Sequence, residues 1–357
     1  MSVIEKSVLV GMSGGIDSTA VCHLLQKQGY KVIGLTFITC DSSIASAEAA
    51  ASLAKRLGIE HHVADVREEF RATVVHSFIE SYLSGITPNP CVNCNLQMKF
   101  RILTEWADKL GCEKIATGHY VKVKTVNGKY FLVTGDDDFK DQSYFLWRLT
   151  QEQLSRVIFP LGEWEKSNVR KYLNDAGFEQ VSSGGESMEV CFIPGDYRDF
   201  LKSNIPNINE RIKQGSFVDS EGRVLGQHQG FPYYTIGQRK GLGIALGYPA
   251  YVIKINAEKN TVMLGGEEQL KADDLLIEAP AWVAGVPDDE LTVRIRYRSR
   301  PIPCEKPLSL PDGRFLVHLK QTAMAITPGQ SAVFYVNNCV VGGAFIASQR
   351  GINQWLK

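Results

Sequence analysis

The chain has 357 residues, 44% of them apolar, and its 39 Lys and Arg residues balance 39 Asp and Glu residues. This length and apolar content allow two or three domains with their own cores and exclude a disordered chain. No apolar run reaches the ~18 residues that a membrane span needs, so we expect a cytoplasmic protein with no membrane partner. Its eight cysteines are then expected to be reduced thiols.

In chain order, the N-terminal part alternates predicted strands and helices. The strands are expected at 8–11, 32–37, 62–66 and 114–117, and the helices at 19–28, 45–57, 68–83 and 96–110. This alternation predicts an α/β fold with a doubly wound parallel sheet, which binds ligands at the carboxyl ends of its strands.

The later elements change in character along the chain. Asn127-Gly128 predicts a hairpin turn, and Thr150 with Gln153 predicts a capping box for a helix to about 157. Another helix is expected over about 165–176. Beyond 208, short strands and glycine turns predict two small β domains. We therefore divide the chain into an α/β catalytic domain (1–205), a central β domain (206–272) and a C-terminal β-barrel (273–357).

The zero net charge hides two neighbouring segments of opposite sign. Residues 258–290 hold nine acids and two lysines, whereas residues 291–357 hold nine Lys and Arg and two acids. Arginine occupies every other position from Arg294 to Arg300, so a strand there would put four guanidinium groups on one face. We favour a phosphate backbone as the partner of this face over the alternative, a solvated face paired with the acidic segment.

The most informative motif lies between the first strand and the first helix. It reads Gly11-Met12-Ser13-Gly14-Gly15-Ile16-Asp17-Ser18. Paired glycines, two hydroxyls and a helix N-terminus together predict a phosphate cradle, although the lysine of a Walker A loop is absent. A carboxylate beside phosphates needs a cation between them, so we expect Asp17 to act through Mg²⁺.

Three cysteines stand apart from the five in apolar or strand-like settings. Cys91 and Cys94 form a CxxC before the helix predicted from Leu96, and Cys191 lies late in the α/β part. Proximity to a helix N-terminus, with Lys99 and Arg101 nearby, predicts a lowered pKa for Cys94. A single CxxC leaves redox, metal-binding and catalytic roles open.

Taken together, these motifs closely resemble those of the tRNA-specific 2-thiouridylases, within the ATP pyrophosphatase (PP-loop) superfamily, and the resemblance runs nearly end to end. It rests on the loop, Thr87 to Pro90 with Cys94-Asn95, Thr117 to Tyr120, Lys140 to Leu146, Cys191 to Ile193, Tyr233 to Gly243, Arg296 to Arg298 and Thr327 to Gln330.

The resemblance implies that ATP adenylates O2 of the wobble uridine in the tRNA anticodon arm, and that sulfur then replaces this oxygen. Cys191 would carry the sulfur as a persulfide, supplied by a donor such as a cysteine desulfurase or a sulfur-relay protein. Cys94 would release it through a transient disulfide. The implied ATP-binding residues are Gly11, Met12, Ser13, Gly14, Gly15, Ile16, Asp17, Ser18, Phe37 and Gly118. The implied tRNA-binding residues are His119, Lys140, Asp141, Gln142, Arg296, Tyr297 and Gln330.

One departure from the family pattern leaves an alternative open. Many relatives have Asp after Thr-Pro-Asn-Pro, where this chain has Cys91. Cys91, as an auxiliary thiol, would form with Cys94 and Cys191 the ligand set of a [4Fe–4S] cluster. Rival functions are another adenylating PP-loop ligase, a non-catalytic tRNA-binding protein, and a paralogue with a different tRNA or sulfur donor.

Overall fold

A computed structural model describes residues 6–182 and 190–349, and its first part is a parallel sheet. Its strands are β1 (Ser7–Gly11), β2 (Lys31–Ile38), β3 (Glu60–Asp65), β4 (Lys114–Ala116) and β7 (Val157–Ile158). They run in the order β3-β2-β1-β4-β7. The order reverses between β1 and β4, so the predicted doubly wound sheet is confirmed and its ligand-binding crevice lies beyond these two strands.

Helices cover both faces of this sheet. Side chains alternate along each strand, so both faces carry apolar side chains that need to be buried. The helices are α1 (Ile16–Lys27), α2 (Ile44–Leu57), α7 (Gln151–Arg156), α8 (Lys166–Asp175) and α9 (Glu179–Ser182), beside the two composite helices described next. Leu9 of β1 packs in the cluster that contains Leu103, whereas Val8 and Val10 pack with Val21 of α1. Each face therefore has its own apolar core.

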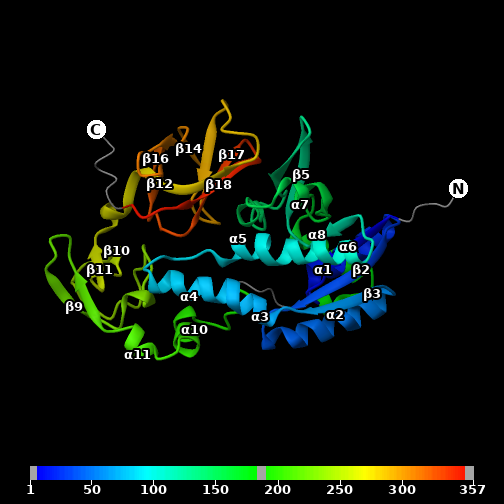
Figure 1. Cartoon of the computed structure of the whole chain (residues 1–357), viewed down its shortest axis with the longest axis horizontal. Coiled ribbons are helices and arrows are strands. Elements are labelled where there is room, and N and C mark those ends of the chain that lie inside the picture. The colour runs from blue at the N-terminus through cyan, green and yellow to red at the C-terminus, as the bar shows by residue number, and fades with distance from the viewer. Residues whose placement is uncertain (1–5, 183–189, 350–357) are drawn as a thin grey trace.

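Two long helices contain π-helical turns. The first consists of α3 (Arg67–Phe70), a π turn (Arg71–Val75) and α4 (His76–Leu83). The second consists of α5 (Pro90–Cys94), a π turn (Asn95–Phe100) and α6 (Arg101–Lys109). The second helix was expected to begin at Leu96, which is wrong: Pro90 starts it, because the fixed φ of proline suits the first helical position. Figure 1 shows both helices running from the sheet toward the central β domain, below the barrel.

The central part follows α10 (Tyr197–Asn204) and α11 (Ile208–Arg211). It is a four-stranded sheet in the order β10-β11-β8-β9. Its strands are β8 (Gly215–Val218), β9 (Val224–His228), β10 (Tyr251–Asn256) and β11 (Thr261–Gly265). Its apolar side chains, such as Phe217 and Val252, join one core with Phe78 and Phe192 of the α/β part.

The last part is a closed barrel in the order β12-β16-β14-β13-β17-β18, with β18 pairing back onto β12. Its strands are β12 (Lys271–Trp282), β13 (Leu291–Arg294), β14 (Ile302–Cys304), β16 (Phe315–Met324), β17 (Ser331–Val336) and β18 (Cys339–Ile346), and β15 (Leu308–Ser309) pairs beside β16. Two β parts after the α/β part were predicted and are confirmed; the exact division at 205 and 272 stays a prediction.

The predicted hairpin is confirmed, as β5 (Val121–Val126) and β6 (Lys129–Thr134). Asn127 and Gly128 have φ values of 49° and 73°, as a tight hairpin turn requires. The sequence did not indicate its partner. β6 pairs with β18 at Val133 and Cys339, so the hairpin from the α/β part extends the sheet of the barrel.

The predicted arginine strand is wrong. β13 ends at Arg294, and the next residues turn, with the backbone N–H of Ser299 donating to the carbonyl oxygen of Arg296. Arg294 and Arg296 bond inside the protein, so the four guanidinium groups do not share a face. The internal bonds of these two side chains, described below, override the strand that the two-residue alternation predicts.

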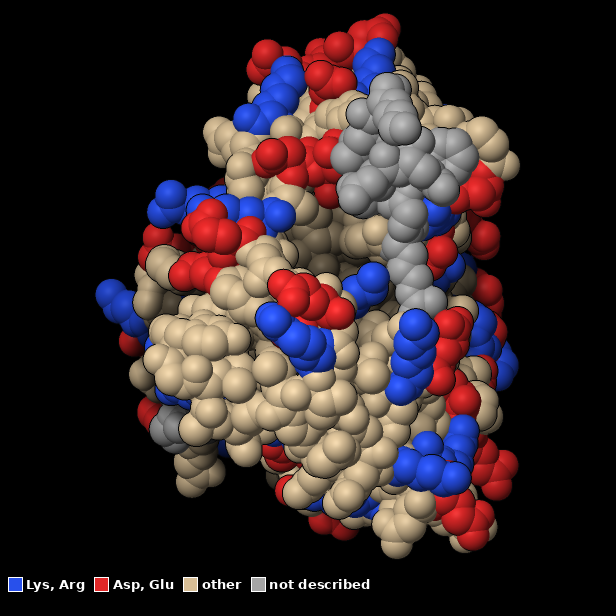
Figure 2. Space-filling model, turned by 90° about the vertical axis from the view of Figure 1, so that its left-hand side faces the viewer, with Lys and Arg blue, Asp and Glu red and all other residues tan. Residues whose placement is uncertain are grey.

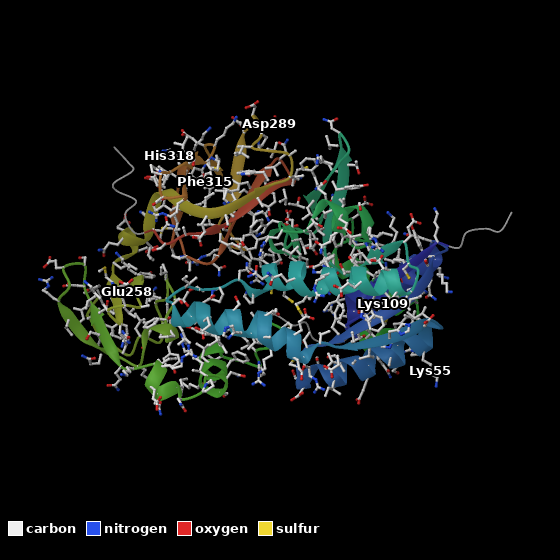
Figure 3. The ribbon with its side chains drawn as sticks, in the orientation of Figure 1. Lys55, Lys109, Glu258, Asp289, Phe315 and His318 are labelled. Atoms are coloured by element: carbon white, nitrogen blue, oxygen red, sulfur yellow. The ribbon has the colours of Figure 1, made fainter. Side chains whose placement is uncertain are left out.

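The charged side chains of the surface are distributed over all three parts (Figure 3). Lys55 and Lys109 lie on the helices of the parallel sheet, Glu258 lies in the central part, and Asp289 and His318 lie on the barrel. Among residues 6–182 and 190–349, no helix has the length and apolar character that crossing a membrane requires.

Candidate active site

The loop between β1 and α1 leaves backbone N–H groups open to an anion. Gly14 has a φ of 75°, and a Cβ there would lie 2.8 Å from the carbonyl oxygen of Ser46, so only glycine fits without strain. Gly15 precedes α1 and provides no side-chain cap. The backbone N–H of Ser13 donates to Oγ of Ser18 over 3.2 Å. The first N–H groups of α1 have no side-chain cap, and these donors together with the dipole of α1 favour a phosphate.

Gly118 lets the end of β4 approach this helix N-terminus. A Cβ on Gly118 would lie 2.8 Å from Cβ of Asp17 and 3.3 Å from the backbone nitrogen of Ser18. The two strand ends on either side of the switch point therefore meet at the loop, as the α/β pattern predicts.

Asp17 has a lysine partner that the sequence did not indicate. Nζ of Lys166, the first residue of α8, lies 2.7 Å from each carboxylate oxygen of Asp17. The hydroxyl of Tyr120 donates to the same carboxylate over 2.7 Å. Lys166 and Asp17 are 149 positions apart, so only the fold reveals this pair. Both oxygens of Asp17 therefore already have protein partners, and Mg²⁺ at Asp17 stays a prediction.

Cys91 and Cys94 lie inside the first turn and a half of a helix, and Cys191 follows the residues 183–189 that lie outside the described ranges. Cys94 is buried, Cys91 is half-buried and Cys191 is exposed; all three are free thiols. The three are neighbours, since Cys191 acts electrostatically on both of the others.

The expected lowering of the Cys94 pKa is wrong. Burial raises the pKa of Cys94 to about 11, and Lys99 opposes this only in part. Burial likewise raises the pKa of Cys91. Burial lowers the pKa of Lys99, but attraction to Cys91, Cys94 and Cys191 in their thiolate form outweighs that effect and raises the pKa above its ordinary value. Desolvation thus outweighs the helix dipole at Cys94.

The cysteines are not arranged as a metal site. Within the described part of the chain, no group of three or more His, Cys, Asp or Glu side chains is placed to hold a metal ion. The residues present therefore do not fit a preformed [4Fe–4S] cluster.

A cavity of about 710 Å³ joins the loop to the CxxC segment and to the barrel. The predicted site residues that line it are Ser13, Gly15, Ile16, Asp17, Cys91, His119, Lys140, Gln142, Tyr297 and Gln330. Residues that the prediction missed also line it, among them Asn95, Tyr120, Tyr144, Phe145, Lys166 and Arg298. Lys99, Lys140, Lys166 and Arg298 make the described lining positive, with Asp17 as its acid.

The other predicted residues are not part of this lining: Gly11, Met12, Gly14, Ser18, Phe37, Cys94, Gly118, Asp141, Cys191 and Arg296. Met12 supports the loop from below, because its side chain packs against Gly34 of β2. Phe37, near the end of β2, is half-buried and packs between two apolar cores.

His119 is a neutral side chain in the cavity wall. Its Nδ1 lies 2.7 Å from Oγ1 of Thr117, and its ring contacts Phe100 and Phe159. Burial, aided by the charge of Lys99, lowers the pKa of His119 to about 3. His119 therefore offers a hydrogen bond to a ligand without a charge.

Asp141 and Arg294 form a buried ion pair between the α/β part and the barrel. Nη1 of Arg294 donates to Asp141 over 2.9 Å, and the Asp141 side chain is 2% exposed. Asp141 also accepts from the backbone N–H groups of Gly135 and Ser143. This environment makes Asp141 a structural partner in this structure, not a surface group facing RNA.

Arg296 and Gln330 bond to backbone groups around the cavity. Arg296 donates to the carbonyl oxygen of Ala325 over 2.8 Å and to Oγ1 of Thr327 over 2.8 Å. The amide of Gln330 donates to the carbonyl oxygens of Thr87 and Pro88, over 3.0 and 3.1 Å. The barrel thereby holds the segment that leads into Cys91.

Figure 2 shows the face made by the two β parts, which is hollowed between the barrel above and the central part below. Acidic and basic side chains are interspersed over this face, and both kinds lie at the rim of the hollow.

Comparison with known proteins covers the same three parts. Family models match residues 6–195 (tRNA methyl transferase HUP domain), 198–266 (tRNA methyl transferase PRC-barrel domain) and 272–346 (Aminomethyltransferase beta-barrel domain). The tRNA-specific 2-thiouridylase MnmA 3 of Bacteroides fragilis is 58% identical over 358 residues, which cover 99% of this chain and 97% of that protein. The chain belongs to the tRNA-specific 2-thiouridylase family.

More distant relatives carry the same name. The tRNA-specific 2-thiouridylase MnmA of Amoebophilus asiaticus is 43% identical, over 95% of this chain and 94% of its own length. Among solved structures, the NH3-dependent NAD synthetase of Campylobacter jejuni has 16% identity and a TM-score of 0.34, and it covers 52% of this chain and 72% of its own.

Proposed function

We propose that this member of the family is a tRNA-uridine 2-sulfurtransferase, which uses ATP to convert the wobble uridine of certain tRNAs to 2-thiouridine. The observation that carries the proposal is the single cavity lined by Ser13 and Asp17 of the phosphate loop, by Cys91, and by Gln330 of the barrel. Adenylation needs the loop, sulfur transfer needs thiols nearby, and a large polyanion needs the positive lining.

In the first half-reaction, O2 of uridine attacks the α-phosphorus of ATP, and pyrophosphate leaves with the electron pair of the broken P–O bond. Ser13, Gly15 and the N-terminus of α1 bind phosphate oxygens through N–H and hydroxyl donors. Asp17 is the residue that would hold Mg²⁺ beside the phosphates, where the cation would supply positive charge to the leaving group. The uracil has to leave the anticodon stack to reach this cavity.

In the second half-reaction, Cys191 carries sulfur as a persulfide received from a desulfurase or relay protein. The terminal sulfur attacks C2, and AMP leaves with its oxygen. Cys94 then attacks the Sγ of Cys191, so the S–S bond breaks, 2-thiouridine is released and a Cys94–Cys191 disulfide remains. A thiol reductant restores both cysteines with two electrons. The exposure of Cys191 supports its role as acceptor from another protein, and eight free thiols suit the cytoplasm.

The experiment that tests this proposal incubates anaerobically purified protein with ATP, Mg²⁺, a cysteine desulfurase with cysteine, and unmodified tRNA. AMP and 2-thiouridine, measured together by mass spectrometry, should both appear only with tRNA. Cys191→Ser and Cys94→Ser should lower 2-thiouridine by at least about a thousandfold and still release AMP. AMP release without any 2-thiouridine in the unaltered chain would contradict the sulfur step and favour another adenylating ligase.

Cys91 separates the persulfide route from the cluster route. Under the persulfide route, Cys91→Asp should keep activity within about tenfold, because no bond to Cys91 forms or breaks. An enzyme that contains stoichiometric iron and sulfide and loses all activity with Cys91→Asp would instead support the [4Fe–4S] alternative. Cys304→Ser, at a buried cysteine of β14 in the barrel that is not part of the cavity lining, reports on the effect of thiol loss alone.

A further inference from the structure

Lys166 reaches the phosphate loop from a distant part of the chain. As the first residue of α8 it extends its Nζ to both oxygens of Asp17, at 2.7 Å each, and its side chain is only 12% exposed. Its ammonium also lies 5.7 Å from the ring centre of Tyr120, which bonds the same carboxylate. Lys166 and Asp17 both line the cavity beside Ser13.

Stability alone is a weak reason for this pair. Removing an ammonium and a carboxylate from water costs free energy that offsets much of their mutual attraction. A buried ion pair therefore often stabilises a fold no more than apolar side chains of similar volume would. The pair also stands where a triphosphate would come, at the N-terminus of α1. A lone carboxylate there would repel phosphates, whereas Asp17 with Lys166 is neutral overall and keeps ammonium donors near the loop.

The position of Lys166 is fixed by its backbone. Its N–H donates to Oδ2 of Asp137 over 3.0 Å, and Oδ1 of Asp137 accepts from the N–H groups of Phe139 and Lys140. One carboxylate therefore holds both the start of α8 and the segment that carries Lys140 into the cavity. Preorganisation of this kind suits a residue that meets a ligand.

We propose that Lys166 is the phosphate-binding lysine of the nucleotide site, held by Asp17 over the loop and contacting the β- and γ-phosphates of ATP. It supplies from α8 the charge that a Walker A loop supplies from within its own sequence. The β- and γ-phosphates leave together as pyrophosphate. Lys166 therefore contacts them both before and after the bond between the α-phosphorus and the bridging oxygen breaks. This inference rests on the proposed adenylation.

The test compares nucleotides that differ only in these phosphates. Dissociation constants of ATP, AMP and inorganic pyrophosphate are measured by calorimetry with Mg²⁺ on the full chain, without tRNA or sulfur donor. Lys166→Met should weaken ATP and pyrophosphate binding roughly ten- to a hundredfold and leave AMP within about twofold, since one charge-assisted contact is lost. Equal weakening of ATP and AMP, or unchanged ATP binding, would overturn the proposal.

Two further variants guard against a folding artefact. Lys166→Gln leaves a donor for Asp17 but no charge, and it should lose the same ATP preference as Lys166→Met. Lys171→Ala removes an exposed lysine from the same helix and should bind all three ligands as the unaltered chain does. If the unaltered chain forms no 2-thiouridine but Lys166→Gln selectively weakens ATP binding, the phosphate-binding role of Lys166 is supported while the proposed thiolation fails.

Discussion

At the scale of single residues, the cavity wall depends on side chains whose chemistry burial has changed. His119 was expected from its place after a strand-end glycine, and the structure puts it in the wall as a neutral imidazole bonded to Thr117. Cys94 was expected as a ready thiolate, and burial instead favours the thiol. Sequence position indicated both residues, but it could not indicate how completely water is excluded from them.

The low pKa of His119 predicts a pH dependence of stability. The folded-state pKa of about 3 lies below the ordinary value of 6.5, so the unfolded chain binds the proton more readily. His119 therefore contributes stability that is fully present above pH 6.5 and is lost as the pH falls toward 3, by at most about 1.4 kcal/mol per pH unit.

Replacing His119 with Asn removes this titration and keeps a polar side chain beside Thr117. The difference in urea unfolding free energy between His119→Asn and the unaltered chain should shift in favour of the variant between pH 6.5 and 4.5. A difference that stays constant across this range would show that His119 titrates normally.

Lys166 marks the limit of residue-level prediction. The loop lacks the lysine of a Walker A loop, and its sequence predicts Mg²⁺ as the cation at Asp17. The lysine that pairs with Asp17 belongs to another helix, and no local pattern distinguishes Lys166 from the other lysines of that segment. Pairs this distant in sequence arise from topology, which a motif does not encode.

At the scale of elements, periodicity predicted strands and helices well where a local signal existed. The hairpin turn at Asn127-Gly128 and the capping box of Thr150 and Gln153 are present as predicted. The start at Pro90 was missed because Pro88 and Pro90 suggest a loop. The arginine alternation failed because Arg294 has a buried carboxylate partner from another part of the chain.

That partner predicts a stability effect across elements. Asp141→Asn should destabilise the chain by about 3–5 kcal/mol, because it leaves the guanidinium of Arg294 buried without its counter-charge. The double variant Asp141→Asn with Arg294→Met should recover most of this loss. Urea denaturation measures both, and Asp288→Asn, which breaks an exposed pair with Lys306, serves as a control with little effect. Equal effects at Asp141 and Asp288 would contradict a buried, essential pair.

At the scale of the whole molecule, the barrel holds the segment that leads into α5, which begins at Pro90. Gly329 lies at the contact, with a φ of 89°, and its N–H donates to the carbonyl oxygen of Ile346. A Cβ there would lie 2.2 Å from Cγ2 of Ile86 and 2.8 Å from the carbonyl oxygen of Thr87. The barrel and residues 86–87 thus meet with no room for a side chain.

Gly329→Ala should displace this segment and lower the rate of 2-thiouridine formation about tenfold or more, while ATP binding stays within about twofold. Gly313→Ala is the matched control, because Gly313 has a φ of 82° and nothing within 4 Å of its Cβ position. It carries the backbone strain, roughly 1 kcal/mol, without the clash. The two variants are compared by their single-turnover rates of 2-thiouridine formation. Equal rates would show that thiolation does not depend on the contact between the barrel and residues 86–87.

Because β6 pairs with β18, the barrel cannot be exchanged independently of the α/β part. Apolar residues of the hairpin, such as Leu132, share a core with Val333 and Val340 of the barrel. A chimera that takes its barrel from a relative would also need residues 121–134 from that relative. Otherwise, paired strands of one sheet would come from two different proteins. In this chain the barrel and residues 121–134 therefore form one structural unit that is discontinuous in sequence, and we expect substitutions in the hairpin to require matching substitutions in β18.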